Sequence, residues 1–176
     1  MASEFTAQLS DARDELIERV VARLLERGET LSLAESCTGG LLSARLAARA
    51  GISAVYVGSV VAYSNAVKEN LLGVPVSLLK SVGAVSLPVA RRMSLGARAA
   101  FKTTWALSIT GIAGPAGGSG QKPVGTVCFG MAGPGLEQAE AEQMFFEGSR
   151  TRVQAASAEH ALRMLLRRIS VEPSKG

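Results

Sequence analysis

Short strand-like segments alternate with helical segments along this chain, and this alternation constrains the fold more than any other feature. The candidate strands are four to eight residues long and are bounded by glycine, proline or polar residues. They are Leu31 to Ala34, Val55 to Ala62, Trp105 to Thr110, Gly125 to Ala132 and Ala139 to Phe146. Because strands that alternate with helices form layered domains, the pattern predicts an α/β fold.

The helical segments carry apolar residues three and four positions apart. In the first one, Leu16, Val20 and Leu24 share a face, and Gly28 is a natural stop. The predicted helices are Thr6 to Arg27, Gly39 to Arg49, Asn65 to Leu72, Leu87 to Phe101 and Val153 to Ile169.

Two details refine the expected sheet. Val55 to Ala62 is rich in β-branched and apolar residues, which is typical of a buried strand. The last two candidate strands are joined across Gly133-Pro134-Gly135, which indicates a hairpin. A hairpin pairs antiparallel strands, so the sheet is expected to be mixed although mostly parallel.

The composition sets limits on what this chain can be. A chain of 176 residues that is 47% hydrophobic fits one domain with a substantial core, and the tail at 170–176 is polar. The basic residues are spread over several helices, so nucleic-acid binding is not favoured. No apolar run is long enough to span a membrane, and the first residues do not have the pattern expected of a secretory leader. We therefore expect a cytoplasmic protein.

The segment from Glu35 to Gly40 follows the first candidate strand and precedes a helix. Ligands of open α/β sheets bind beyond the carboxyl ends of strands, and a helix start favours an anion or an oxyanion. Ser36 or Thr38 is therefore a candidate nucleophile or phosphate ligand. The alternative is that they cap the helix while Gly39 and Gly40 allow tight packing.

A serine nucleophile needs a base. The only histidine, His160, lies in the last helix and would reach Ser36 only if that helix closed over the site. A desolvated lysine with a lowered pKa is the other option, and Lys68 or Tyr63 could supply the base. The alternative is that Tyr63 lies at the edge of the core and Lys68 is solvated.

Two further segments are candidate anion sites. The glycine-rich loop Gly111 to Pro123 follows a predicted strand, but it matches neither a phosphate-binding Walker loop nor a dinucleotide fingerprint. Arg150 and Arg152 stand in the first turn of the last helix, where a cation opposes the helix dipole unless an anion binds. The alternatives are a flexible surface loop, which the preceding strand makes the less favoured interpretation, and two solvated arginines.

Five segments taken together resemble one family, the CinA carboxyl-terminal domain, whose stand-alone members act as nicotinamide-nucleotide amidases. The resemblance covers roughly Leu9 to Ile169. The matching segments, in chain order, are Glu35-Ser36-Cys37-Thr38-Gly39-Gly40, Tyr63-Ser64-Asn65 with Lys68, Gly83-Ala84-Val85-Ser86, Gly111-Ile112-Ala113-Gly114-Pro115 and Lys122-Pro123-Val124-Gly125-Thr126-Val127.

The resemblance implies hydrolysis of the carboxamide of nicotinamide mononucleotide to nicotinate mononucleotide and ammonia, without a metal or another cofactor. It also implies a three-layer α/β/α sandwich and a homodimer or higher oligomer. The amino-terminal domain of full-length CinA proteins is not expected in this chain, nor is their pyrophosphatase activity. A non-catalytic nucleotide-binding or regulatory CinA-like domain is the alternative.

With this reaction in view, Ser36 is expected to attack the amide, with Lys68 as base and Tyr63 assisting proton transfer. The N–H groups near Cys37 to Gly39 are expected to hold the oxyanion, and Cys37 is a rival nucleophile.

The remaining site residues are expected to hold the nucleotide. Arg150 and the Gly111 to Gly118 loop are assigned to its phosphate. Thr38 and Thr110 are expected to line the site with their hydroxyl groups. The full set of expected substrate-binding residues is Thr38, Gly39, Thr110, Gly111, Gly114 and Arg150.

Overall fold

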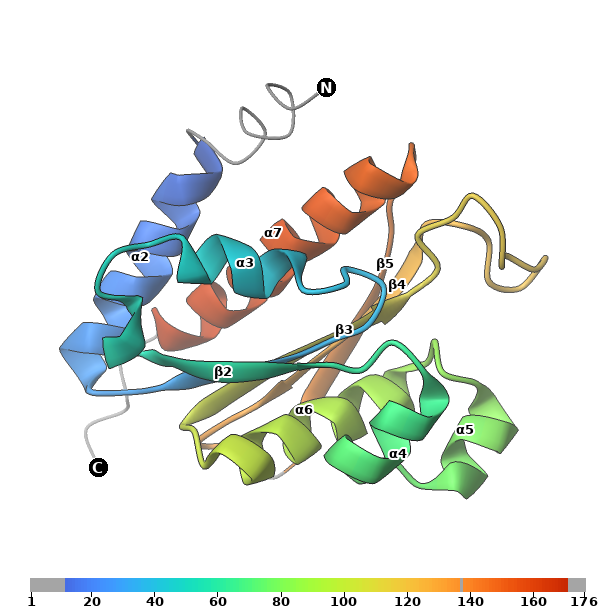
Figure 1. The fold of residues 1–176 in the computed structure, drawn as a ribbon, viewed down its shortest axis with the longest axis horizontal. Coiled ribbons are helices and arrows are strands. Elements are labelled where there is room, and N and C mark those ends of the chain that lie inside the picture. The colour runs from blue at the N-terminus through green and yellow to red at the C-terminus, as the bar shows by residue number, and fades with distance from the viewer. Residues whose placement is uncertain (1–11, 137, 171–176) are drawn as a thin grey trace.

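The computed structural model describes residues 12–136 and 138–170, which form one five-stranded sheet covered by helices on both faces (Figure 1). The strands lie in the order β2-β1-β3-β4-β5. Their bounds are β1 Leu31–Glu35, β2 Tyr56–Val61, β3 Trp105–Gly111, β4 Thr126–Ala132 and β5 Glu140–Phe145.

The sheet is mixed, as the hairpin predicted. β1 pairs in parallel with β2 and with β3, whereas β4 pairs antiparallel with both β3 and β5. Only β4 therefore runs against the other four strands. As a result, β1, β2, β3 and β5 all end at the same edge of the sheet.

Helices cover the two faces of the sheet in separate layers (Figure 1). One layer holds α2 (Ala12–Arg27), α3 (Leu41–Ala47) and α7 (Arg150–Ile169). The other holds α4 (Asn65–Leu72), α5 (Val76–Val82) and α6 (Leu87–Phe101). A short 3-10 helix, Ile52–Ala54, leads into β2. The structure is thus a three-layer α/β/α sandwich.

Two apolar clusters hold these layers together. The larger joins α2 and α7 to the sheet and includes Val20, Leu162 and Trp105, all buried. The smaller joins α4, α5 and α6 to the opposite face and includes Leu72, Met93 and Ala106. Scarce aromatics leave aliphatic side chains as the main filling of both clusters.

One contact between the helices of the smaller layer is unusually close. A Cβ atom built on Gly96 of α6 would lie only 2.0 Å from the carbonyl oxygen of Leu72 at the end of α4. Only glycine allows the two helix backbones to approach in this way. This contact fixes the position of α4, the helix that carries Lys68.

The predicted elements are mostly confirmed, with one clear error. α4 and α6 have the predicted bounds, and the β4–β5 hairpin is present. The prediction that Val55 to Ala62 forms a buried strand is wrong, because β2 is an edge strand and is only partly covered. The start of the first predicted helix and most of the polar tail lie outside the described residues. No described helix is both long and apolar enough to cross a membrane.

Candidate active site

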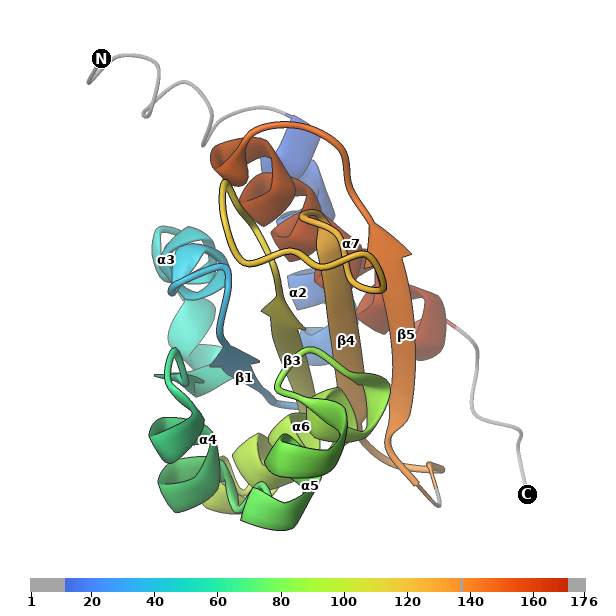
Figure 2. The same cartoon turned by 90° about the vertical axis from the view of Figure 1, so that its right-hand side faces the viewer.

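The candidate site lies at the edge where the parallel strands end (Figure 2). Ser36 follows β1, Tyr63 comes shortly after β2, Thr110 and Gly111 end β3, and Arg150 begins α7 beyond β5. These segments are far apart in sequence, and the shared strand direction brings them to one place. This is the position at which open α/β sheets bind ligands.

Ser36 is fixed by the turn that follows β1. Its N–H donates to the carbonyl of Ile109 at 2.9 Å, which extends the pairing of β1 with β3 by one residue. Gly39 and Gly40 then take φ values of 62° and 95°, a conformation that residues with a side chain rarely adopt. Ser36 itself is 8% exposed.

The start of α3 is capped by Glu35 and not by Ser36 or Thr38. The buried Glu35 carboxylate accepts the N–H groups of Gly40, Leu42 and Ser43 at 3.2, 3.2 and 2.7 Å, and the Ser43 hydroxyl as well. The N-cap residue of α3 is Gly40, which has no side chain. The capping interpretation of Ser36 and Thr38 is therefore wrong, and the Ser36 hydroxyl is left for other contacts.

The Ser36 hydroxyl contacts Lys68. The Lys68 Nζ lies 2.9 Å from Ser36 Oγ and 2.7 Å from the carbonyl oxygen of Ala62. Lys68 is 2% exposed, so the interpretation of a solvated lysine is wrong. Its place is set by α4, which begins where the Ser64 hydroxyl accepts the N–H of Val67.

The charge state of Lys68 depends on its burial. Removing an ammonium group from water disfavours its charged form, so burial lowers the pKa of Lys68 from its usual value. Among the described residues, no carboxylate forms a salt bridge with Lys68 that would counter this effect. Lys68 is therefore suited to accept a proton from Ser36.

Two backbone N–H groups beside Ser36 are available to an oxyanion. The Gly39 N–H already donates to the Ser36 carbonyl at 3.0 Å, and its part in holding an oxyanion stays a prediction. In the described part of the chain, the N–H groups of Cys37 and Thr38 donate to no other residue, although the Cys37 N–H interacts with its own thiol. The carbonyl of Cys37 in turn accepts the side-chain amide of Gln154, from α7, at 2.8 Å.

Cys37 is less suited than Ser36 to be a nucleophile. Burial raises the pKa of the Cys37 thiol to about 12, so the thiol is protonated at neutral pH. The thiolate is the reactive form of cysteine. The Cys37 side chain also belongs to the larger apolar cluster.

Arg150 closes the other side of the site. Its guanidinium donates to the carbonyl of Gly114 and to the hydroxyl of Tyr63, each at 2.9 Å. Both partners are neutral, so the positive charge of Arg150 is not compensated by them. Tyr63 is 62% exposed, and its hydroxyl is not hydrogen bonded to Ser36 or Lys68 in the described part of the chain.

These residues enclose a cavity of about 270 Å³. It is lined by all three expected catalytic residues and by most of the expected substrate-binding residues. The expected residues that line it are Ser36, Tyr63, Lys68, Thr110, Gly111, Gly114 and Arg150. Thr38 and Gly39 are not among its described lining residues, and their role in substrate binding stays a prediction.

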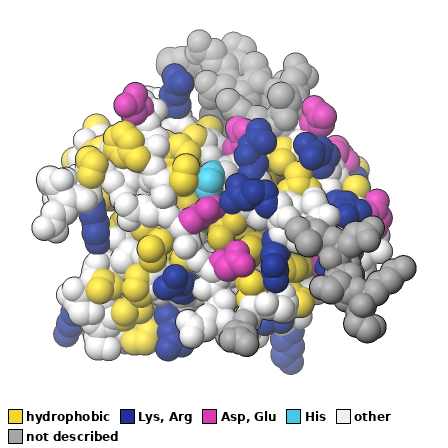
Figure 3. Space-filling model, turned by 180° about the vertical axis from the view of Figure 1, so that it is seen from behind, with side chains coloured by type: hydrophobic (Ala, Val, Ile, Leu, Met, Phe, Trp, Pro, Cys, Tyr) yellow, Lys and Arg dark blue, Asp and Glu magenta, His cyan; other side chains and the backbone are white. Residues whose placement is uncertain are grey.

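His160 belongs to a different part of the molecule. It bonds to Glu142 of β5 at 2.7 Å and packs on the ring of Phe129, so a Ser36–His160 pair is not formed. Figure 3 shows the histidine side chain on the far face, near acidic and basic groups. Lysine and arginine side chains are scattered over that face and form no single block (Figure 3).

The sequence and fold of this chain match a known family. A model of the CinA C-terminal domain matches residues 13–169. The chain belongs to the CinA C-terminal domain family.

Curated relatives of this CinA domain are longer proteins. A CinA-like protein of Anaeromyxobacter sp. (strain Fw109-5) is 52% identical over 159 residues, which cover 90% of this chain and 38% of that protein. A CinA-like protein of Prochlorococcus marinus is 46% identical over 153 residues, or 86% of this chain and 36% of that protein. The chain thus spans little more than a third of the length of these relatives.

Solved structures of the CinA superfamily share the fold. The CinA superfamily protein KP700603 from Klebsiella pneumoniae 700603 has a TM-score of 0.86 at 37% identity, covering 91% of this chain and 99% of that one. The competence/damage inducible protein CihA from Agrobacterium tumefaciens has a TM-score of 0.87 at 36% identity, covering 92% and 98%. The family expectation of an α/β/α sandwich is confirmed.

Two residues of this CinA domain were missed from its sequence. Nothing in the sequence around Glu35 indicates that its carboxylate accepts the N–H groups at the start of α3. Gln154 lies 117 residues from its partner Cys37, in a helix that shows only an amphipathic pattern. The only sequence signal for this contact is that Gln154 is a polar residue near the apolar face of α7.

Proposed function

We propose that this CinA domain is a nicotinamide-nucleotide amidase, in which Ser36 attacks the carboxamide carbon of nicotinamide mononucleotide. The contact of 2.9 Å between Lys68 Nζ and Ser36 Oγ carries this proposal. A buried serine–lysine pair is a nucleophile beside a base, which is the arrangement that covalent amide hydrolysis requires. The identity of the substrate, nicotinamide mononucleotide, is inferred from the resemblance to the family.

In the first half of the reaction, neutral Lys68 accepts the Ser36 hydroxyl proton as the oxygen bonds to the carbonyl carbon. The tetrahedral oxyanion accepts hydrogen bonds from the free N–H groups of Cys37 and Thr38. Lys68 then returns its proton to the departing amide nitrogen. Ammonia leaves, and the nicotinoyl group stays on Ser36 as an ester.

In the second half, water takes the place of ammonia. Lys68 accepts a proton from water as the hydroxyl oxygen bonds to the ester carbon, and it then protonates Ser36 Oγ as this oxygen leaves. The products are nicotinate mononucleotide and the free enzyme. Tyr63, which stands at the mouth of the site, is assigned to assist these proton transfers.

The nucleotide phosphate is assigned to Arg150. Its guanidinium has two neutral partners and faces the cavity beside the Gly111 to Gly118 loop. A guanidinium can bind two oxygens of one phosphate at once. The hydrogen bond from Arg150 to Gly114 would also hold the loop in place around the ligand.

Ammonia release from nicotinamide mononucleotide by purified protein tests the activity. We expect one ammonia and one nicotinate mononucleotide for each substrate consumed, and no release by Ser36→Ala. Saturable substrate binding without release by the unmodified protein would instead identify a non-catalytic nucleotide-binding domain. A cytoplasmic homo-oligomer is part of the same proposal, and sedimentation velocity measures the oligomeric state.

A further inference from the structure

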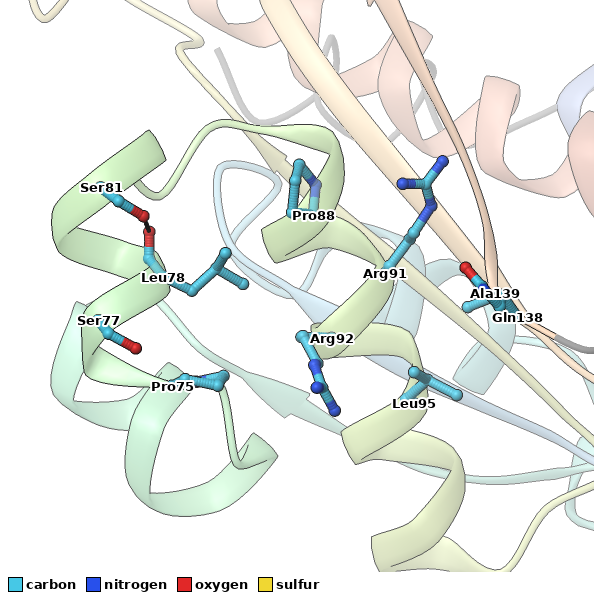
Figure 4. A pocket seen from close by; sticks show the side chains of 10 residues that line it. All are labelled: Pro75, Ser77, Leu78, Ser81, Pro88, Arg91, Arg92, Leu95, Gln138 and Ala139. Atoms are coloured by element: carbon cyan, nitrogen blue, oxygen red, sulfur yellow. Dashed lines mark hydrogen bonds between the residues drawn. The ribbon is translucent and has the colours of Figure 1, made fainter.

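A second and larger hollow lies on the α5–α6 side of the molecule, away from Ser36 (Figure 4). Its volume is about 660 Å³, and it is formed by α5, α6 and the segment before β5. Its lining residues are Pro75, Ser77, Leu78, Ser81, Pro88, Arg91, Arg92, Leu95, Gln138 and Ala139. None of them lines the Ser36 cavity. We call this hollow the α5–α6 groove.

Two adjacent arginines give the α5–α6 groove its charge. Figure 4 shows Arg91 leaving α6 on the side of Gln138 and Arg92 on the side that faces α5. Within residues 12–136 and 138–170, neither guanidinium has a hydrogen-bond or ion-pair partner. No carboxylate among the described residues therefore neutralises either charge.

The surrounding sequence adds to this charge. Between Glu69 and Glu137 the chain contains no acidic residue, and it contains six basic ones. They are Lys80, Arg91, Arg92, Arg98, Lys102 and Lys122. The net charge of the whole chain is +4, so this stretch of +6 leaves −2 for the remainder. Four of the six, Lys80, Arg91, Arg92 and Arg98, lie on α5 or α6, and these two helices carry no acidic residue, so their charge favours an anion.

The groove also offers apolar surface and hydroxyl groups. Leu78 and Leu95 stand on its two helical walls, and Leu95 is 38% exposed. Ser77 and Ser81 add hydroxyl groups along α5. A cavity of a few hundred cubic ångströms that combines apolar walls with a few polar groups is typical of a small-ligand site.

We propose that the α5–α6 groove binds a small phosphate-bearing ligand with an apolar or aromatic part, of the nucleotide class. Arg91 and Arg92 contact its phosphate oxygens, and Leu78 and Leu95 contact its ring. Binding in the α5–α6 groove is independent of the activity proposed for Ser36, because the two sites share no lining residue. The segment between Ser81 and Pro88 runs from one site to the other, and Ala84 and Val85 within it line the Ser36 cavity.

Calorimetric titration of the protein with ATP tests this proposal. We expect saturable binding that weakens at least about tenfold in a variant with both Arg91→Gln and Arg92→Gln, because each lost phosphate contact is charge-assisted. Lys80→Gln is the matched control, since it removes one charge from α5 without touching the groove. It should change the affinity no more than about twofold, as expected for a charge that does not line the groove and is screened by salt.

Two further titrations test whether the phosphate is recognised and whether ATP binds at the Ser36 cavity instead. Adenosine should bind far more weakly than ATP, and Arg150→Gln should leave the ATP affinity unchanged. The melting temperatures of the double arginine variant and of Lys80→Gln should agree with that of the unmodified protein within about 2 °C, because surface substitutions of side chains without described partners cost little.

Several results would overturn the proposal. One is no saturable binding of ATP. A second is loss of binding in Arg150→Gln but not in the double arginine variant, which would place the ligand at Ser36. A third is equal weakening by Lys80→Gln. A fourth is tighter binding of a short single-stranded oligonucleotide than of ATP through the same arginines, which would indicate a nucleic-acid surface.

Discussion

The Lys68 ammonium nitrogen lies 2.9 Å from the Ser36 hydroxyl oxygen, although the two residues stand 32 positions apart in the chain. Ser36 is placed by the end of β1 and Lys68 by the second turn of α4. Neither residue is held there by a salt bridge in the described part of the chain. Their contact is a product of the fold, and the predictions below test what it does.

The activity should depend on pH through Lys68. Burial disfavours its ammonium form, so its pKa lies below the usual 10.5 and the basic form becomes populated at lower pH. We expect kcat/KM to rise with pH and to level off above this lowered pKa, as a pH–rate profile records. Lys68→Arg should be inactive throughout, because a guanidinium stays protonated. Activity that falls as pH rises, or an active Lys68→Arg, would contradict this role.

Arg150 should act on binding more than on chemistry. Its removal takes away a cation assigned to the phosphate, so Arg150→Ala should raise KM for nicotinamide mononucleotide at least about tenfold. The same change should hardly affect nicotinamide riboside, which lacks the phosphate. Tyr63→Phe is a useful comparison, since it removes a partner of Arg150 but leaves the charge. Equal effects of Arg150→Ala on both substrates would refute the phosphate assignment.

Glu35 should be important for stability, because its carboxylate satisfies three backbone N–H groups at the start of α3. Glu35→Gln places an NH₂ group among these donors and should cost about 2 kcal/mol or more. For a chain of this length, that corresponds to a melting temperature lower by about 4–8 °C. Glu69→Gln, at an exposed position on α4, is the control. A melting temperature equal to that of the control would show that Glu35 does not hold the turn.

Gly96 should be essential to the position of α4. An alanine there would place its Cβ 2.0 Å from the Leu72 carbonyl oxygen, so the helices must separate. We expect Gly96→Ala to lower the free energy of unfolding by at least about 2 kcal/mol. It should also lower kcat, because α4 carries Lys68. Gly120→Ala, where nothing lies within 4 Å of an added Cβ, serves as the control in urea unfolding. An unchanged unfolding midpoint in Gly96→Ala would contradict the close packing.

The layered fold was predicted well because helices, strands and turns leave local patterns in the sequence. Helical spacing located α4 and α6 at their observed bounds, and the Gly133-Pro134-Gly135 turn predicted the hairpin. The same signals cannot show the order of strands. An apolar run such as Val55 to Ala62 looks the same in the centre of a sheet and at its edge. The sequence therefore predicts that β2 is buried, whereas its burial depends on whether strands lie on both sides of it, and β2 has a strand on one side only.

The site was predictable in its members but not in its contacts. Motif order pointed to Ser36 and Lys68, but a lysine between Val67 and Glu69 in a short helix gives no sign of being 2% exposed. The capping role of Glu35 depends on the left-handed turn at Gly39 and Gly40, which folds the helix start back over its carboxylate. The bond between Gln154 and Cys37 depends on how α7 packs across the sheet. Such tertiary contacts leave no local pattern.

The rate of ammonia release by Ser36→Ala, measured beside Cys37→Ala, tests the central claim most directly. Because a nucleophile and its base act as one unit, Ser36→Ala should lower kcat by at least about 10³-fold, and Lys68→Ala should do the same. Cys37→Ala should keep most of the activity, since its thiol is protonated at neutral pH. Near-normal turnover by Ser36→Ala, or loss of turnover in Cys37→Ala alone, would contradict the assignment of Ser36 as the nucleophile.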